Sequence, residues 1–178
     1  MTTAGDRIRQ CEKYIHRPRT PYRARKARYD ATADQLFSAG ISNRDILVDV
    51  GAGGTELDVC LRVDYGWRGR YVPVDGWLDG VDLEAWQPPR TFDWFACLEV
   101  LEHLRDPGRL VEALQDNATC GVVITTPNPE VWDVLAMDST HLTPISQDML
   151  REWGFRTTLH TFYGKYQDGI TGLWTGAT

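Results

Sequence analysis

The sequence lacks a long apolar run, and it has few cysteines. No stretch of about 18 apolar residues occurs among the 178 residues, so we expect no membrane-spanning helix. Residues 1–10 read MTTAGDRIRQ and no apolar segment follows them, which argues against a secretory signal and favours the cytoplasm. The four cysteines are widely spaced without a CxxC pair, so we expect small buried side chains rather than a disulfide framework.

Internal repeats, low-complexity segments and linkers are also missing, so the length predicts a single domain. Charge is unevenly distributed: residues 1–30 hold nine Lys or Arg and three Asp or Glu, although the net charge of the chain is −6. We therefore predict a basic N-terminal arm at residues 1–21 and one domain at residues 22–178. Such an arm can steer an anionic substrate or a nucleic acid, or it is simply a solvated terminus.

What is present is an alternation of short apolar segments with helical patterns. It predicts an α/β fold in which helices cover both faces of a doubly wound, mostly parallel sheet. The expected helix ends are Gly40 as a stop, a capping box of Thr55 with Asp58, and the caps Asp106 and Ser146. Seven strands are expected, at residues 46–50, 71–75, 80–83, 92–98, 121–126, 156–162 and 170–174.

A glycine-rich loop follows the first expected strand. Asp49-Val50-Gly51-Ala52-Gly53 allows a tight turn and the close approach of a ligand, and a helix N-terminus comes next. A dinucleotide fingerprint needs a third glycine where this chain has Glu56, and a glutamate there repels a pyrophosphate. The alternative pattern, an acid followed by Gly-x-Gly, fits Asp49, Gly51 and Gly53, and a carboxylate there suits a ligand with an ammonium group.

Two further acids stand at the ends of the next expected strands. Asp75 is placed to accept hydrogen bonds from a ribose diol, and Asp82 is placed to accept one from an adenine amino group. In open α/β sheets a ligand binds beyond the carboxyl ends of the strands. The loop together with both acids therefore predicts a nucleoside cofactor at this edge of the sheet.

Six segments together resemble the class I S-adenosylmethionine-dependent methyltransferases, nearest to the short group with an E-V-L-E-H-L motif after the fourth strand. The resemblance covers about residues 46–155, and the segments are ILVDVGAGG, YVPVD, GVDLE, FDWFACLEVLEHL, GVVITTPNP and HLTPIS. It implies S-adenosylmethionine as cofactor and a methyl transfer to an acceptor. The family usually has glycine where this chain has Thr55, which puts cofactor affinity in question unless Thr55 caps the helix.

The resemblance also implies roles for individual residues. Those expected at the cofactor are Gly51 and Gly53 at the methionine part, Asp49 near its ammonium group, Asp75 at the ribose, Asp82 and Leu83 at the adenine, and Leu98 and Glu99 beside the sulfonium.

Two classes of nucleic-acid methyltransferase do not fit this sequence. Amino methyltransferases of DNA bases carry Asn/Asp-Pro-Pro-aromatic after the fourth strand, where this chain has Leu98-Glu99-Val100-Leu101. A cytosine C5 enzyme needs Pro-Cys, whereas Cys97 follows Ala96.

The candidate catalytic residues are His141, His103 and Glu102. Glu99, Glu102 and His103 have i, i+3, i+4 spacing, which puts them on one face of a helical segment. Together with His141 they are candidate ligands of a divalent metal, which can lower the pKa of a hydroxyl. This set resembles the small-RNA 3′-terminal 2′-O-methyltransferases, whereas the sequence around His141 resembles metal-free relatives in which the histidine is a general base or orders a loop.

The leading hypothesis is an enzyme that methylates an oxygen or nitrogen on a small molecule or a nucleic acid. A metal-assisted RNA 2′-O-methyltransferase and a non-catalytic module that binds S-adenosylmethionine are the alternatives. Trp77, Trp86 and Trp132 are either core residues or the lining of a planar substrate pocket. No membrane partner is expected, and a homodimer stays open because a short chain leaves the cofactor site relatively exposed.

Overall fold

A single six-stranded sheet forms the centre of the protein. The computed structural model describes residues 22–76 and 78–176, so the basic arm expected at residues 1–21 lies outside the described part. The strand order is β2-β1-β3-β4-β6-β5, and only β6 runs antiparallel to its neighbours, which confirms the mostly parallel α/β sheet. The strands are β1 (Ile46–Val50), β2 (Arg70–Val74), β3 (Phe92–Leu98), β4 (Ala118–Pro127), β5 (Arg156–His160) and β6 (Gly169–Thr175).

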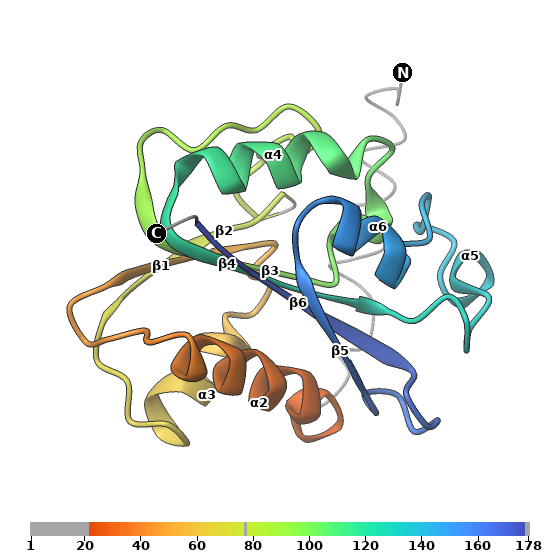
Figure 1. Ribbon diagram of the computed structural model, residues 1–178, viewed down its shortest axis with the longest axis horizontal. Coiled ribbons are helices and arrows are strands. Elements are labelled where there is room, and N and C mark those ends of the chain that lie inside the picture. Colours follow the sequence, from red (N-terminus) through yellow and green to blue (C-terminus); the bar gives the residue numbers. More distant parts are fainter. Residues whose placement is uncertain (1–21, 77, 177–178) are drawn as a thin grey trace.

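Helices cover both faces of this sheet, as expected. Figure 1 shows α2 and α3 on one face and α4 and α6 on the other. Alternate residues of the buried strands feed two apolar cores: Val48 and Val50 pack on the α4 side, and Leu47 packs on the α2 side. The helical elements are α2 (Tyr22–Ser38), α3 (Glu56–Val63), the 3₁₀ turn η1 (Leu101–His103), α4 (Pro107–Asn117), α5 (Val134–Met137) and α6 (Gln147–Glu152).

The sheet has six strands in the described residues, and the prediction of a seventh at residues 80–83 is wrong. That segment is an irregular loop beside β2, which is left as an edge strand. Pro73 supplies the physical reason. The Val74 carbonyl accepts hydrogen bonds from the Gly51 and Ala52 amides that follow β1, so the preceding position faces the outer edge. A proline there has no N–H to offer a further strand.

The expected helix ends are partly right. Ser146 accepts a hydrogen bond from the Met149 amide and caps α6, and Gly40 ends α2 with a φ of 96°. Pro107 begins α4 after Asp106, but the Asp106 side chain makes no capping hydrogen bond. The capping box at Thr55 is wrong: Thr55 has a left-handed backbone (φ 60°, ψ 30°) and its side chain does not cap α3.

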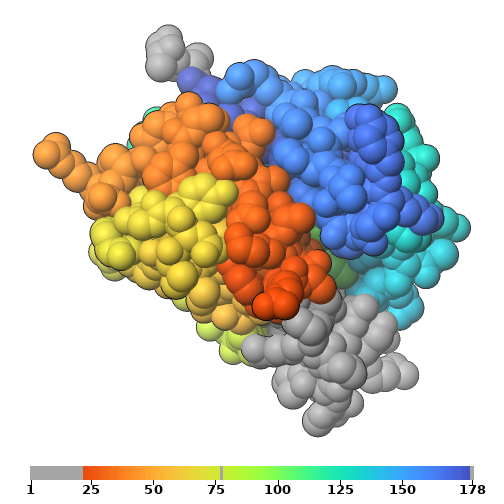
Figure 2. Space-filling view, turned by 90° about the horizontal axis from the view of Figure 1, so that it is seen from below, coloured from red at the N-terminus to blue at the C-terminus, as the bar shows by residue number. Residues whose placement is uncertain are grey.

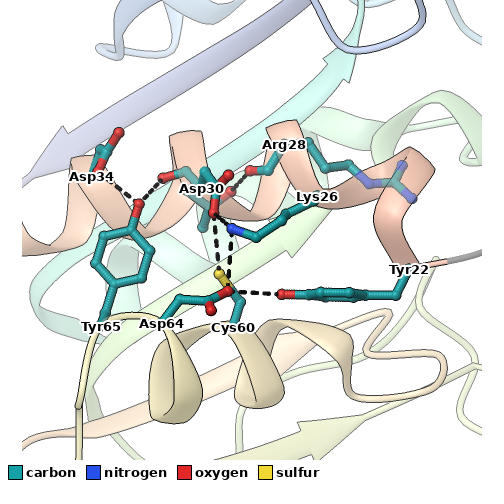
Figure 3. A network of polar contacts seen from close by, with 9 residues as sticks. Tyr22, Lys26, Arg28, Asp30, Asp34, Cys60, Asp64 and Tyr65 are labelled. Atoms are coloured by element: carbon teal, nitrogen blue, oxygen red, sulfur yellow. Dashed lines mark hydrogen bonds and ion pairs between the residues drawn. The ribbon is translucent and has the colours of Figure 1, made fainter.

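A polar network joins α2 to α3 on one face of the molecule (Figure 3). Lys26 bridges Asp30 of its own helix and Asp64 at the end of α3, and the Tyr65 hydroxyl donates to the Asp34 carboxylate over 2.8 Å. Figure 2 shows α2 lying between α3 and the C-terminal β5–β6 hairpin. Lys26 therefore forms ion pairs within the domain, so it is not simply an unpaired cation on a basic surface.

Within residues 22–76 and 78–176, no helix combines the length and the apolar character that a membrane span requires.

Candidate cofactor and methyl-transfer site

The glycine loop lies at the carboxyl end of β1, held against the end of β2. The Gly51 amide donates to the Val74 carbonyl over 2.7 Å, and Gly51 has a φ of 79°. A Cβ atom at residue 51 would lie 2.1 Å from Cγ2 of Val100, which follows β3. Only glycine therefore fits at position 51, for both its left-handed backbone and its contact with Val100. This contact brings the segment after β3 against the loop.

Asp75 is the buried acid at the end of β2, with 5% of its surface exposed. One of its carboxylate oxygens accepts from the Gly53 amide and the other from the Leu78 amide, over 2.8 and 2.9 Å. Its own amide donates to the Asp79 carboxylate over 2.8 Å. Asp75 is thus fixed in direct contact with the glycine loop, and each carboxylate oxygen can accept more than one hydrogen bond. The structure brings together the two parts of the nucleoside site that the sequence predicts.

Asp49 lies in β1 just before the loop and is almost fully buried. Its carboxylate accepts a hydrogen bond from the Tyr71 hydroxyl of the neighbouring β2. Burial raises the pKa of Asp49 to about 7, and the Tyr71 hydrogen bond only partly opposes that rise. A positively charged ligand group near Asp49 would lower this pKa again.

Asp82 and Leu83 come to the same edge through a loop rather than through a strand. A Cβ atom at Gly76 would lie 3.2 Å from the Val81 carbonyl oxygen and 3.6 Å from the Leu83 side chain, so the loop packs against the residue after Asp75. The Glu84 carboxylate accepts from the Arg105 amide over 2.7 Å and ties this loop to the segment before α4. The loop that carries Asp82 therefore packs beside the end of β2 although the expected strand is absent, and the role of Asp82 at the adenine stays a prediction.

Glu99 stands directly after β3 in a left-handed backbone conformation with a φ of 57°. Its carboxylate is held by donors from three separate segments: Arg28 of α2, Thr125 of β4 and Tyr163 in the β5–β6 loop. None of these three partners was predicted from the sequence. Neither Arg28 nor Tyr163 carried a sequence signal, because each comes from a segment far from residue 99 in the chain.

Glu102, His103 and His141 form a second cluster on the other side of the same segment. Their ligand atoms all lie within 4.8 Å of one another, and the rings of the two histidines meet edge to face. Glu102 is fully buried, and neither of its carboxylate oxygens has a hydrogen-bond partner among the described residues. Burial raises the pKa of Glu102 well above its usual range, and the charge of Glu99 raises it further. Glu99 is not part of this cluster.

Comparison with solved structures identifies the fold. No protein-family model matches the sequence, and no curated protein is recognisably similar to it. Among solved structures, N-methyltransferase NodS from Bradyrhizobium japonicum in complex with S-adenosylhomocysteine matches with a TM-score of 0.62 at 11% identity, over 95% of this chain and 97% of that one. The chain has the fold of the class I S-adenosylmethionine-dependent methyltransferases.

Two further structures with this methyltransferase fold match over almost their whole length. Magnesium protoporphyrin IX methyltransferase from Synechocystis, with bound S-adenosylhomocysteine, matches with a TM-score of 0.58 at 14% identity, over 99% of this chain and 96% of that one. A methyltransferase from Aquifex aeolicus matches with a TM-score of 0.59 at 16% identity, over 94% and 97%. At such low sequence identities these matches show the fold alone and do not identify the methyl acceptor.

The residues at this edge of the methyltransferase fold fit a polar nucleoside ligand. Buried polar atoms without a hydrogen-bond partner are costly and uncommon in folded proteins. Those found in the described residues gather in α2 and in the segments at the ends of β3 and β4. They belong to the side chains of Arg25, Arg28, Glu102, Thr126 and Trp132. Together with the Gly51 turn and the fixed Asp75, these unsatisfied groups suit a site that receives a polar ligand.

The tryptophans divide between core and site. Trp67 and Trp94 are buried core residues, as expected for most tryptophans here. Trp86 packs partly buried against the core on the α4 side, while Trp77 lies outside the described residues. Trp132 lies in the loop after β4, with the Lys165 ammonium 3.4 Å from its ring centre. The indole N–H of Trp132 is buried without a hydrogen-bond partner among the described residues, and a role for Trp132 in a planar pocket stays a prediction.

Proposed function

We propose that this chain is an S-adenosylmethionine-dependent methyltransferase that moves a methyl group to an oxygen or nitrogen acceptor. The observation that carries the proposal is the direct hydrogen bond between the Gly53 amide and the buried Asp75 carboxylate. It joins the glycine turn after β1 to the acid after β2, at the sheet edge where open α/β folds bind ligands.

Each part of the cofactor has a chemically suitable partner at this edge. The Asp75 carboxylate would accept hydrogen bonds from the ribose hydroxyls, and Asp82 with Leu83 would border the adenine. Gly51 and Gly53 would contact the methionine part near Asp49, and Leu98 and Glu99 would lie beside the sulfonium. When bound, the cofactor supplies an electrophilic methyl group on a cationic sulfur. Much of the catalysis in such an in-line transfer comes from positioning the reactants.

His141 is the candidate general base. Its Nδ1–H donates to the Val134 carbonyl over 2.6 Å, which leaves the acceptor lone pair on Nε2. The acceptor's hydroxyl or amine would give its proton to Nε2 as its oxygen or nitrogen bonds to the methyl group. The electron pair of the broken carbon–sulfur bond stays on sulfur. His103 is also held through Nδ1, by Thr140, so both rings are oriented by the protein.

Metal-assisted RNA 2′-O-methylation is the second candidate, favoured by the cluster of Glu102, His103 and His141. One carboxylate and two imidazoles suit a divalent transition metal. Ligands of one such ion lie at most about 4.2 Å apart, since each bond is about 2.1 Å long, so the cluster needs only a small contraction. The metal would have to displace the proton that burial favours on Glu102. Glu99 would not be a ligand, because its oxygens already take hydrogen bonds from Thr125 and Tyr163.

The test is transfer of labelled methyl from S-adenosylmethionine into a cell extract that is then divided into nucleic acid, protein and small-molecule fractions, with and without a chelator. Label that enters a fraction regardless of chelator supports His141 as a metal-free base. Label in nucleic acid that disappears with chelator supports the metal cluster instead. If no fraction takes label although the purified chain binds S-adenosylhomocysteine, the chain is a non-catalytic binding module.

A further inference from the structure

The Glu99 carboxylate has side-chain partners from three separate segments of the fold. Its amide donates to the Thr125 carbonyl over 3.0 Å, which fixes the left-handed backbone at residue 99. Such a backbone costs a residue other than glycine some stability, and it persists only where the surroundings impose it. Strain of this kind is concentrated at functional positions, so the conformation of Glu99 calls for a functional explanation.

Both oxygens of the Glu99 carboxylate take hydrogen bonds. One accepts from the Thr125 hydroxyl over 2.9 Å, and the other accepts from the Tyr163 hydroxyl. The Arg28 guanidinium lies 3.3 Å from the second oxygen, with 12% of its side chain exposed. These three donors come from β4, from the β5–β6 loop and from α2, so packing of three separate segments sets the orientation of one carboxylate.

The surroundings favour a negative charge on Glu99 over one on Glu102. Burial raises the pKa of both carboxyls, but Arg28 and the Thr125 hydroxyl oppose the rise at Glu99. At Glu102 neither carboxylate oxygen has a hydrogen bond of good geometry among the described residues. Its own backbone amide, Arg28 and Thr126 favour the charged form, but they do not offset burial and the charge of Glu99. Three further titratable groups interact with Glu99. His141 favours its charged form, the Tyr163 hydroxyl donates to it, and the Glu102 carboxyl feels its charge.

The segment that carries the Glu99 carboxylate lies next to the loop assigned to the methionine part of the cofactor. Glu99 directly precedes Val100, whose side chain packs on Gly51, and the strands are in register with Val50 opposite Cys97. We propose that Arg28 and Tyr163 are positioning residues that hold the Glu99 carboxylate beside the sulfonium, so that the site binds cationic S-adenosylmethionine more tightly than neutral S-adenosylhomocysteine. This inference rests on the proposed function and adds a means of product release. Once the methyl group has left and the sulfur is neutral, the attraction to Glu99 is lost.

Binding of the two ligands to the purified chain tests the inference without knowledge of the acceptor. Titration calorimetry at pH 7.5 should show S-adenosylmethionine binding roughly tenfold more tightly than S-adenosylhomocysteine. Tyr163→Phe removes one hydroxyl and should lower this preference at least threefold, mainly by weakening S-adenosylmethionine. Tyr166→Phe is the matched control, since Tyr166 lies in the same loop and is 81% exposed. It should leave the preference unchanged.

Arg28 is tested with a charge-preserving pair of variants. Arg28→Gln should reduce the preference because Glu99 loses its ion pair, and Arg28→Lys should restore most of it. The preference should also fall at low pH, where Glu99 takes up a proton, and in Tyr163→Phe this fall should move to higher pH. Circular dichroism detects a folding defect in Arg28→Gln. If that variant does not fold, Tyr163→Phe, which removes a single hydroxyl, is used to test the inference.

The outcomes separate the inference from the function on which it rests. Equal affinities for the two ligands in the parent chain, or an unchanged preference in Tyr163→Phe, overturn the role of Arg28 and Tyr163 and leave the methyltransferase proposal standing. A parent chain that binds neither ligand overturns the proposed function itself.

Discussion

The imidazole rings of His103 and His141 meet edge to face with their centroids 4.7 Å apart. His103 comes from the turn after β3, and His141 comes from the long segment between α5 and α6. The Leu142 and Thr143 amides that follow His141 donate to the Glu102 carbonyl, over 2.7 and 3.1 Å. Backbone pairing between the two segments therefore holds the rings together, and the acid–base groups need no ligand to assemble.

His141→Ala is expected to lower methyl transfer about 10²-fold or more, the usual effect of losing a general base. Affinity for S-adenosylhomocysteine should stay within about twofold of the parent, because the role proposed for the ring concerns the acceptor and not the cofactor. Transfer of label into the responsive extract fraction gives the rate, and calorimetry gives the affinity. His160→Gln is the control, since His160 lies in β5 and contacts Thr171. Undiminished transfer by His141→Ala rules out the base assignment.

Thr55→Gly is expected to stabilise the chain by about 1 kcal/mol. A left-handed backbone at a residue with a Cβ atom costs roughly 1–2 kcal/mol, and the added flexibility of glycine in the unfolded chain offsets part of the gain. Urea unfolding measures the difference. Thr55→Ala keeps the Cβ atom and should bring little of the gain. If Thr55→Gly is destabilising by a similar amount, the threonine side chain contributes an interaction that outweighs its backbone strain.

Asp49 should make stability depend on pH in an unusual direction. Its pKa is raised from 3.8 to about 7, so the folded chain keeps a proton that the unfolded chain releases. The stability from this proton is fully present below about pH 4 and is lost as the pH rises to 7. From pH 5 to pH 7 the parent should lose roughly 2 kcal/mol relative to Asp49→Asn, which does not titrate.

Chemical unfolding at a series of pH values measures this loss. Asp148→Asn is the comparison variant, because it makes the same change from carboxylate to amide at a side chain that is 84% exposed. A difference between parent and Asp49→Asn that stays constant with pH means that Asp49 is already ionised in the folded chain at pH 5.

Local patterns in the sequence predicted most of the fold. The apolar run at residues 46–50 and the serine before α6 carry short-range signals, and both gave the element that the structure has. The prediction of a strand at residues 80–83 was wrong because such a strand would have to pair with the outer edge of β2, where Pro73 has no N–H to donate. The conformation of Thr55 follows from the loop closing on Val74 and Asp75 rather than from a local preference for capping.

The candidate site likewise has a part that the sequence predicted and a part that it did not. Asp75 and the glycine loop are close because parallel strands end at one edge, so chain order alone places them together. The partners of Glu99 were missed because Arg28 and Tyr163 come from a helix and a loop far away in sequence. No short-range sequence pattern indicates that these two side chains contact the same carboxylate. The cluster at Glu102 was only partly predicted: the helical spacing that grouped it with Glu99 does not hold, because Glu99 is left-handed and precedes a short 3₁₀ turn.

The most direct test of the cofactor site is calorimetric titration of the parent chain and Asp75→Ala with S-adenosylhomocysteine. We expect one binding site per chain in the parent and at least tenfold weaker binding in Asp75→Ala. Circular dichroism should show that the variant keeps its fold. An unchanged dissociation constant in a folded Asp75→Ala variant, or no binding by the parent, would contradict the assignment of this edge of the sheet as the cofactor site.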